Sequence, residues 1–183
     1  MKKTLLLLAE GFEEVEALTV VDLLRRADIV CDMAALGDSI EVSGSHGIAV
    51  RADRLLSDAE NGEYDGVILP GGLRGTENLA ADGRVAKLLR RYRDEGKLTA
   101  AICAAPTVLA AAGLLAGKRA VCYPGMEPQL CGAAAGDEEV AVDGSVITSR
   151  GLGTAIPFAL ALVAYLDSPE RAQTLAKAIV YRQ

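Results

Sequence analysis

The strongest constraint on the fold is the alternation of short, continuously apolar segments with segments of helical periodicity. Runs with the length of strands buried on both faces occupy residues 3–9, 29–36, 64–70 and 98–102. Helical spacing, with Asp82 and Ser168 as N-caps and Gly113 as a terminator, predicts helices over 13–27, 82–95, 105–113, 153–166 and 169–180. Shorter strands are predicted over 41–50, 120–124 and 145–150. Because a strand buried on both faces needs helices on each side, this order predicts an α/β fold with a mostly parallel central sheet.

Composition limits the kinds of partner that the chain can bind. Its 183 residues suffice for one core, and no linker, repeat or low-complexity segment divides them, so we expect a single domain over residues 1–183. The net charge of −6 disfavours nucleic acid and anionic membrane surfaces, because both need a basic patch. Aromatic residues make up only 4% of the chain and tryptophan is absent, so we expect no stacking platform for bases.

The N-terminal run imitates a secretory leader without completing one. In "MKKTLLLLAE" two lysines precede leucines, but the apolar run is short and acidic residues follow at once. The apolar stretch 99–117 is interrupted by Pro106 and Gly113, which argues against a membrane span. The four cysteines form no CxxC pair and the single histidine is His46, so we expect no metal site. These features predict a cytoplasmic protein with reduced thiols.

Residues capable of chemistry gather where the predicted strands end. The sequences at these ends are AEGFEEVE (9–16), LPGG (69–72), AICAA (101–105) and TSRG (148–151). Ligands of open α/β sheets bind at the carboxyl ends of the strands, so we expect the four segments to meet in space. They supply acids, paired glycines, a cysteine and an arginine.

Cys103 occupies the point where a predicted strand turns sharply into a helix. A nucleophile on such an elbow needs small neighbours, and alanines 101, 104 and 105 meet that need. The start of the following helix favours the thiolate, and the backbone N–H of Gly72 could join it in an oxyanion hole. The alternative is a buried structural thiol, which is the common state of cysteine in proteins. Position alone leaves both interpretations open.

Three acids near the first predicted helix offer a partner for this thiol. Glu13 and Glu14 lie in the first turn, where any helix favours acids, and a capping role explains them. Glu16 lies deeper, between apolar neighbours, where burial would keep its carboxyl partly protonated. The glycine-rich segments 71–75 and 113–118 match neither a dinucleotide nor a P-loop pattern, so we expect no bound nucleotide.

Four motifs in order make the chain resemble the ThiJ/PfpI superfamily. They are GFEEVEALTVVDLLRRA (11–27), YDGVILPGG (64–72), AAICAAPTVLAAAGLLAGK (100–118) and ITSRGLGTAIPFALALVAYL (147–166). Among its branches, the closest likeness is to the one that contains the human parkinsonism-associated deglycase and its bacterial relatives. The resemblance implies a flavodoxin-like three-layer α/β/α sandwich and a homodimer with the first helix near its interface.

The resemblance also implies roles for single residues. Cys103 would be the reactive nucleophile, Glu16 the acid that hydrogen-bonds its sulfur, and Gly72 and Ala104 the backbone donors to an oxyanion or an oxidised sulfur. Ala104 stands where the peptidase-like branch has histidine, so a Cys-His protease dyad is absent from that position. Tyr123 stands where the deglycase branch often has a pocket histidine, and His46 where relatives often have arginine. With Arg150, these two are candidate pocket residues.

The expected activity is carbonyl chemistry that needs no cofactor. The Cys103 thiolate would attack a small 2-oxoaldehyde such as methylglyoxal, or an early glycation adduct of a protein, with Glu16 as acid and base. The alternative is a peroxide sensor or redox-regulated chaperone that uses the same cysteine without turnover. Glyoxalase and deglycase activities are not separated by the sequence.

Overall fold

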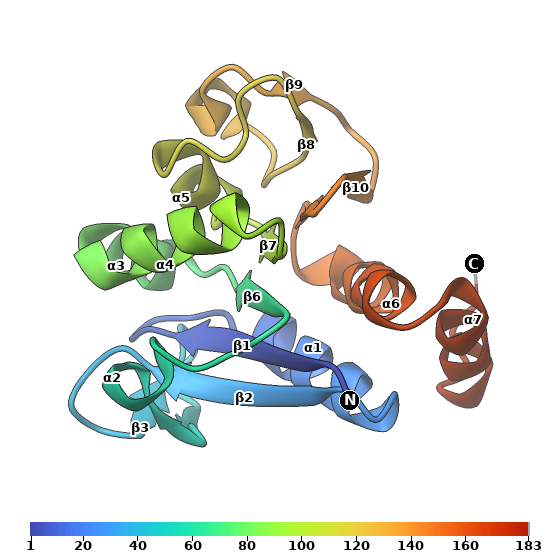
Figure 1. Cartoon of the computed structure of the whole chain (residues 1–183), viewed down its shortest axis with the longest axis horizontal. Helices are drawn as coiled ribbons and strands as arrows, with labels where there is room; N and C mark the ends of the chain where they lie inside the picture. Colours follow the sequence, from blue (N-terminus) through green and yellow to red (C-terminus); the bar gives the residue numbers. More distant parts are fainter. Residues whose placement is uncertain (183) are drawn as a thin grey trace.

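The computed structural model describes residues 1–182, and within them seven strands form a central sheet in the order β10-β11-β7-β6-β1-β2-β5 (Figure 1). In that order the strands cover Val140–Asp143, Val146–Ser149, Leu98–Ile102, Gly66–Leu69, Lys3–Leu8, Val30–Ala35 and Arg54–Leu55. Every pairing is parallel except that of β10 with β11. The predicted α/β class with a mostly parallel sheet is therefore confirmed.

Helices cover both faces of the sheet and enclose two apolar cores. One core packs α1 (Glu14–Arg26), α6 (Ala155–Leu166) and α7 (Pro169–Ala178) against the sheet. The other lies under α2 (Leu56–Ala59), α3 (Leu73–Ala81), α4 (Gly83–Asp94) and α5 (Pro106–Ala111). This is the flavodoxin-like three-layer arrangement, because the alternate side chains of strands such as β1 enter opposite cores. In the described residues, no helix has both the length and the apolar character needed to cross a membrane.

Two small two-stranded sheets and two 3-10 turns lie outside the central sheet of the described residues. The hairpin of β3 (Glu41–Ser43) and β4 (Ala49–Arg51) forms one small sheet, and β8 (Arg119–Ala120) with β9 (Ala134–Ala135) forms another. Two 3-10 turns complete the chain, η1 (Glu127–Leu130) and η2 (Leu152–Thr154). In Figure 1, β8 and β9 lie on the same side of the molecule as β10, away from β2.

Local signals fixed several helix ends as expected. The Asp82 side chain accepts the Arg84 N–H at the start of α4, and the Ser168 side chain accepts the Arg171 N–H at the start of α7. Gly113 follows α5 with a φ of 81°, a conformation that glycine adopts without strain.

The predicted strand over 120–124 is wrong. Only Ala120 of that segment is in β8, and the rest lacks a regular ladder because its N–H groups bond elsewhere. The Val121 N–H donates to Thr148 Oγ1 at 2.9 Å, and the Tyr123 N–H donates to the Cys103 carbonyl at 2.8 Å. The segment thus braces the turn that carries Cys103 instead of extending a sheet.

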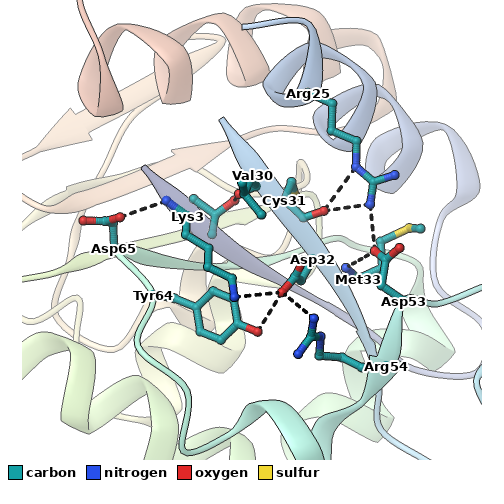
Figure 2. Close-up of polar contacts among 11 residues, drawn as sticks. Lys3, Arg25, Val30, Cys31, Asp32, Met33, Asp53, Arg54, Tyr64 and Asp65 are labelled. Atoms are coloured by element: carbon teal, nitrogen blue, oxygen red, sulfur yellow. Dashed lines mark hydrogen bonds and ion pairs between the residues drawn. The ribbon is translucent and has the colours of Figure 1, made fainter. Parts of the chain in front are cut away.

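Strand β2 is paired on its outer side only at its end, and side chains bond two of its other backbone groups (Figure 2). Arg25 donates from Nε and Nη2 to the Cys31 carbonyl, at 3.2 and 2.8 Å. Asp53 accepts the Met33 N–H at 2.8 Å and bonds Arg25 at 2.7 Å. These contacts occupy backbone groups that an exposed strand edge would otherwise offer to another chain.

Candidate active site

The four strand-end segments do meet, and Cys103 lies at their centre. Directly after β7, this residue has a φ of 65°, which is a left-handed conformation that a cysteine rarely adopts. The turn is held on both sides, because its N–H donates to the Ser149 carbonyl at 3.0 Å and its carbonyl accepts the Tyr123 N–H. Backbone strain fixed by surrounding hydrogen bonds is a recurrent feature of functional sites.

Glu16 reaches the same point from the first turn of α1. Its side chain is 1% exposed, and Oε2 accepts the Gly71 N–H at 2.8 Å. The other oxygen, Oε1, is buried without a hydrogen-bond partner among the described residues. A buried carboxylate oxygen that lacks a donor favours the protonated form or a ligand that donates to it.

Gly71 provides the space in which the thiol and the carboxyl approach each other. A Cβ at this position would lie 2.6 Å from both Cys103 Cβ and Glu16 Oε2, and 3.1 Å from the sulfur. The sequence indicates Gly72 as a backbone donor but gives no separate role to Gly71. The signal was present as a pair of glycines at a strand end, but only the fold reveals that the first of them provides clearance.

The sulfur faces two backbone donors as well as the acid. Hydrogen bonds from the Gly72 and Ala104 N–H groups lower the pKa of the Cys103 thiol, but they are outweighed. Burial and the negative charge of Glu16 raise that pKa to about 12. Burial raises the pKa of Glu16 to about 7, against the opposing effects of Gly71 and Cys103.

The backbone donors of the elbow favour the thiolate, but burial and an ionised Glu16 outweigh them. Burial raises the pKa of Cys31 and Cys122 as well, to about 11, so none of these three thiols has the pKa of an ordinary free thiol. The thiol and the carboxyl are so closely coupled that they titrate as a pair. Either group can hold the single proton that remains near neutral pH.

The three candidate pocket residues do not lie together. Tyr123 and Arg150 line a hollow of about 470 Å³ beside the elbow, together with Leu152 and Thr154. The Tyr123 ring covers Gly151, and Arg150 Nη1 donates to the Asp137 carbonyl at 2.9 Å. His46 is absent from this hollow and lies on the turn between β3 and β4 with its side chain 70% exposed.

The residues around His46 form a separate polar cluster. His46 Nδ1 lies 3.1 Å from Glu14 Oε2 and 3.5 Å from Glu13 Oε1, and the ligand atoms of these three residues lie within 4.8 Å of one another. Ser45 Oγ donates to this group. Hydrogen bonds within the cluster account for its arrangement, so we assign no metal to it. Glu14 is nevertheless only 3% exposed, which a helix-capping acid does not require.

Fold and site together define a class of protein, namely an α/β sandwich with a strained cysteine at a strand-to-helix elbow and a buried acid beside its sulfur. Residues 2–165 match the DJ-1/PfpI family, and the chain belongs to that family.

Similarity to individual relatives extends over nearly the whole chain. Protein dj-1beta of Drosophila melanogaster is 41% identical over 98% of this chain and 97% of its own. The glutathione-independent glyoxalase DJR-1.2 of Caenorhabditis elegans is 36% identical over 96% of this chain and 95% of its own. The chain spans only 39% of protein DJ-1 homolog B of Arabidopsis thaliana, to which it is 41% identical. This chain also aligns with the solved structure of oxidized Toxoplasma gondii DJ-1 over 100% of both chains, with a TM-score of 0.97 and 38% sequence identity.

Proposed function

We propose that this protein is a cofactor-independent glyoxalase that converts a small 2-oxoaldehyde such as methylglyoxal into a 2-hydroxy acid. The observation that carries the proposal is the buried Glu16 carboxyl against the Cys103 thiol, with an Oε1 that accepts no hydrogen bond from residues 1–182. The similarity to a relative named as a glutathione-independent glyoxalase supports it. Early glycation adducts form reversibly, so draining the free aldehyde would also clear adducts from proteins.

The reactive form carries the proton on Glu16. Burial and the charge of an ionised Glu16 raise the pKa of the Cys103 thiol to about 12, so the thiol stays protonated near neutral pH in that state. When Glu16 is neutral, the repulsion is removed and its O–H can donate to the thiolate. The nucleophile is therefore a Cys103 thiolate beside a protonated Glu16.

In the first step, the Cys103 thiolate attacks the aldehyde carbon and forms a C–S bond. The carbonyl electron pair moves onto oxygen, which the Gly72 and Ala104 N–H groups stabilise until Glu16 donates its proton to it, which gives a hemithioacetal and leaves Glu16 as a carboxylate. Glu16 then takes the proton from the former aldehyde carbon and returns one to the neighbouring carbon, which gives a 2-hydroxy thioester. Water hydrolyses the thioester to the 2-hydroxy acid and restores the thiol. One carbon is oxidised and its neighbour reduced, so no external oxidant is needed.

The direct experiment compares methylglyoxal consumption and lactate formation by the wild type and by Cys103→Ser. Turnover that is lost in the variant supports the enzyme. Cys122→Ser is the matched control, because this thiol is also buried but lies outside the pair of Cys103 and Glu16, and it should retain activity. A wild type that consumes no methylglyoxal would overturn the proposal.

A peroxide sensor or redox-regulated chaperone is the second candidate. Cys103 is half-buried, so small oxidants can reach it, and the donors proposed for an oxyanion would also stabilise an oxidised sulfur. A similar fold has been determined for an oxidized relative. Stoichiometric peroxide uptake at Cys103 without turnover of any 2-oxoaldehyde would favour this function.

We further propose that the protein is a cytoplasmic homodimer. Val15 and Leu18 of α1 are 48% and 38% exposed, and Ile48 of the β3–β4 turn is 56% exposed. Apolar side chains at these positions suit an interface that includes the first helix, as the family resemblance implies.

A further inference from the structure

Glu14 differs from every ordinary first-turn acid, because its carboxylate is buried and receives donors from another part of the chain. Oε1 accepts the His46 N–H at 2.7 Å, and Oε2 accepts from Ser45 Oγ at 3.1 Å. Burial opposes ionisation, yet these contacts and the residue's own backbone N–H lower the pKa of Glu14 to about 2. The carboxylate thus stays charged and keeps the β3–β4 turn bound at neutral pH.

The backbone of the turn is shaped to admit this carboxylate. A Cβ on Gly44 would lie 2.3 Å from Glu14 Oε1, so only glycine allows the approach. The main chains are also joined, since the Ser45 N–H donates to the Phe12 carbonyl at 2.8 Å and the Gly11 N–H donates to the Ser43 carbonyl at 2.8 Å. The turn and the start of α1 therefore form one rigid unit.

Helix α1 needs such a fastening because it has no cap of its own. Glu13 is its N-cap residue, but its side chain makes no capping hydrogen bond. Uncapped first turns are weakly held, because their N–H groups lack partners within the helix. The contacts of Glu14 do not satisfy these N–H groups, but they fasten the first turn to the β3–β4 turn.

The same first turn sets the position of Glu16. The Glu13 N–H donates to the Gly71 carbonyl at 2.9 Å, and Glu16 Oε2 accepts the Gly71 N–H at 2.8 Å. Gly71 in turn lies against Cys103, without room for a methyl group. A shift of the first turn would therefore move the carboxyl relative to the sulfur.

We propose that Glu14 is a positioning residue for the thiol–acid pair, which acts by fixing the first turn of α1 through the β3–β4 turn. This inference rests on the proposed function for its kinetic consequence only. Its effect on the reactivity of Cys103 is independent of any substrate.

The test uses Glu14→Gln, which preserves size and lets the His46 N–H keep an acceptor but removes the charge. We expect kcat for methylglyoxal to fall roughly tenfold with KM little changed, because small misplacements of a reacting group are costly. The pH profile of Cys103 alkylation should shift as well, since Glu16 controls it. Asp22→Asn is the matched control, because this acid lies on the same helix with its side chain 56% exposed and should change neither.

A double variant separates positioning from a general loss of stability. If Glu14 acts through Glu16, Glu14→Gln should have no further effect on kcat or on the alkylation profile when Glu16→Gln is already present. Additive effects, or a lower melting temperature with an unchanged kcat and alkylation profile, would overturn the inference. Should the wild type fail to turn over methylglyoxal, the proposed function would fall, and the alkylation profiles would still decide the role of Glu14.

Discussion

Replacing Glu16 with glutamine separates the two tasks that the proposed mechanism gives to this carboxyl. Glutamine is nearly the same size and can donate an N–H to the sulfur, so it can support a thiolate. It cannot accept a proton from carbon and return it. We therefore expect methylglyoxal turnover to fall roughly 100-fold or more, while Cys103 remains reactive toward an alkylating agent.

The pKa values of the pair set the size of the second effect. Burial and an ionised Glu16 raise the pKa of Cys103 to about 12, whereas glutamine leaves burial opposed by the Gly72 and Ala104 donors. The pKa of Cys103 in Glu16→Gln should therefore be lower than that of Cys103 beside an ionised Glu16, because the repulsion from the carboxylate is gone. In the wild type, alkylation should rise through about pH 7, where the pair loses its first proton, and then stay level.

Both effects can be measured on the same samples. Iodoacetamide labelling between pH 5 and pH 11, read for each cysteine by mass spectrometry, gives the thiol profile, and lactate formation gives turnover. Glu16→Asp should lose turnover as well, because its shorter side chain cannot reach the proton. Turnover at the wild-type level in Glu16→Gln would refute the proposed proton transfer. If Cys103 of Glu16→Gln reacted with iodoacetamide only above pH 11, the proposed effect of the Glu16 charge on the thiol would be refuted.

Three further changes follow from particular contacts. Gly71→Ala should lower turnover roughly 100-fold and the free energy of unfolding by about 1–3 kcal/mol, because the new methyl group overpacks the space between the thiol and the acid and separates them; kcat/KM and urea denaturation measure the two effects. Asp53→Ala leaves the Met33 N–H without its acceptor and should lower the free energy of unfolding by about 1–3 kcal/mol, measured by urea denaturation. The wild type should sediment at close to twice 19.1 kDa, and Leu18→Asp should sediment as a monomer if α1 contributes to the interface.

The sequence predicts the parts of the fold that depend on local patterns of apolar and polar residues. Strands β1, β2, β6 and β7 are continuous apolar runs, and such runs occur where helices cover both faces of a sheet. Helix α3 was missed because its N-cap residue is Gly72, which has a φ of 88° and no side chain to form a cap, and because the helix contains Gly75. That second glycine is required by distance, since a Cβ there would lie 2.8 Å from the Phe12 backbone.

Strand β10 was also missed, although Asp143 and Gly144 are a common turn pair between antiparallel strands. Its residues alternate between buried and exposed positions over only four residues, which is too short a pattern to distinguish a strand from a loop.

The site was harder to predict because its chemistry depends on residues that are distant in sequence. Glu13, Glu14 and Glu16 all read as first-turn acids, and only the β3–β4 turn makes the second of them a buried anion with a pKa of about 2. The neighbouring acid that faces Gly71 instead has a pKa of about 7. Two carboxyls on one helical turn thus differ by several pKa units because one is surrounded by donors and the other by apolar atoms and a thiol.

The pKa of the Cys103 thiol is likewise set by groups that surround it from distant parts of the sequence. A strand-to-helix elbow places backbone N–H groups near Cys103, and this local feature lowers the pKa of the thiol as expected. The carboxyl from α1 reverses the outcome when it is charged and supports the thiolate when it is neutral. The elbow can be recognised in the sequence, but the protonation state of the acid beside it determines whether Cys103 is a nucleophile.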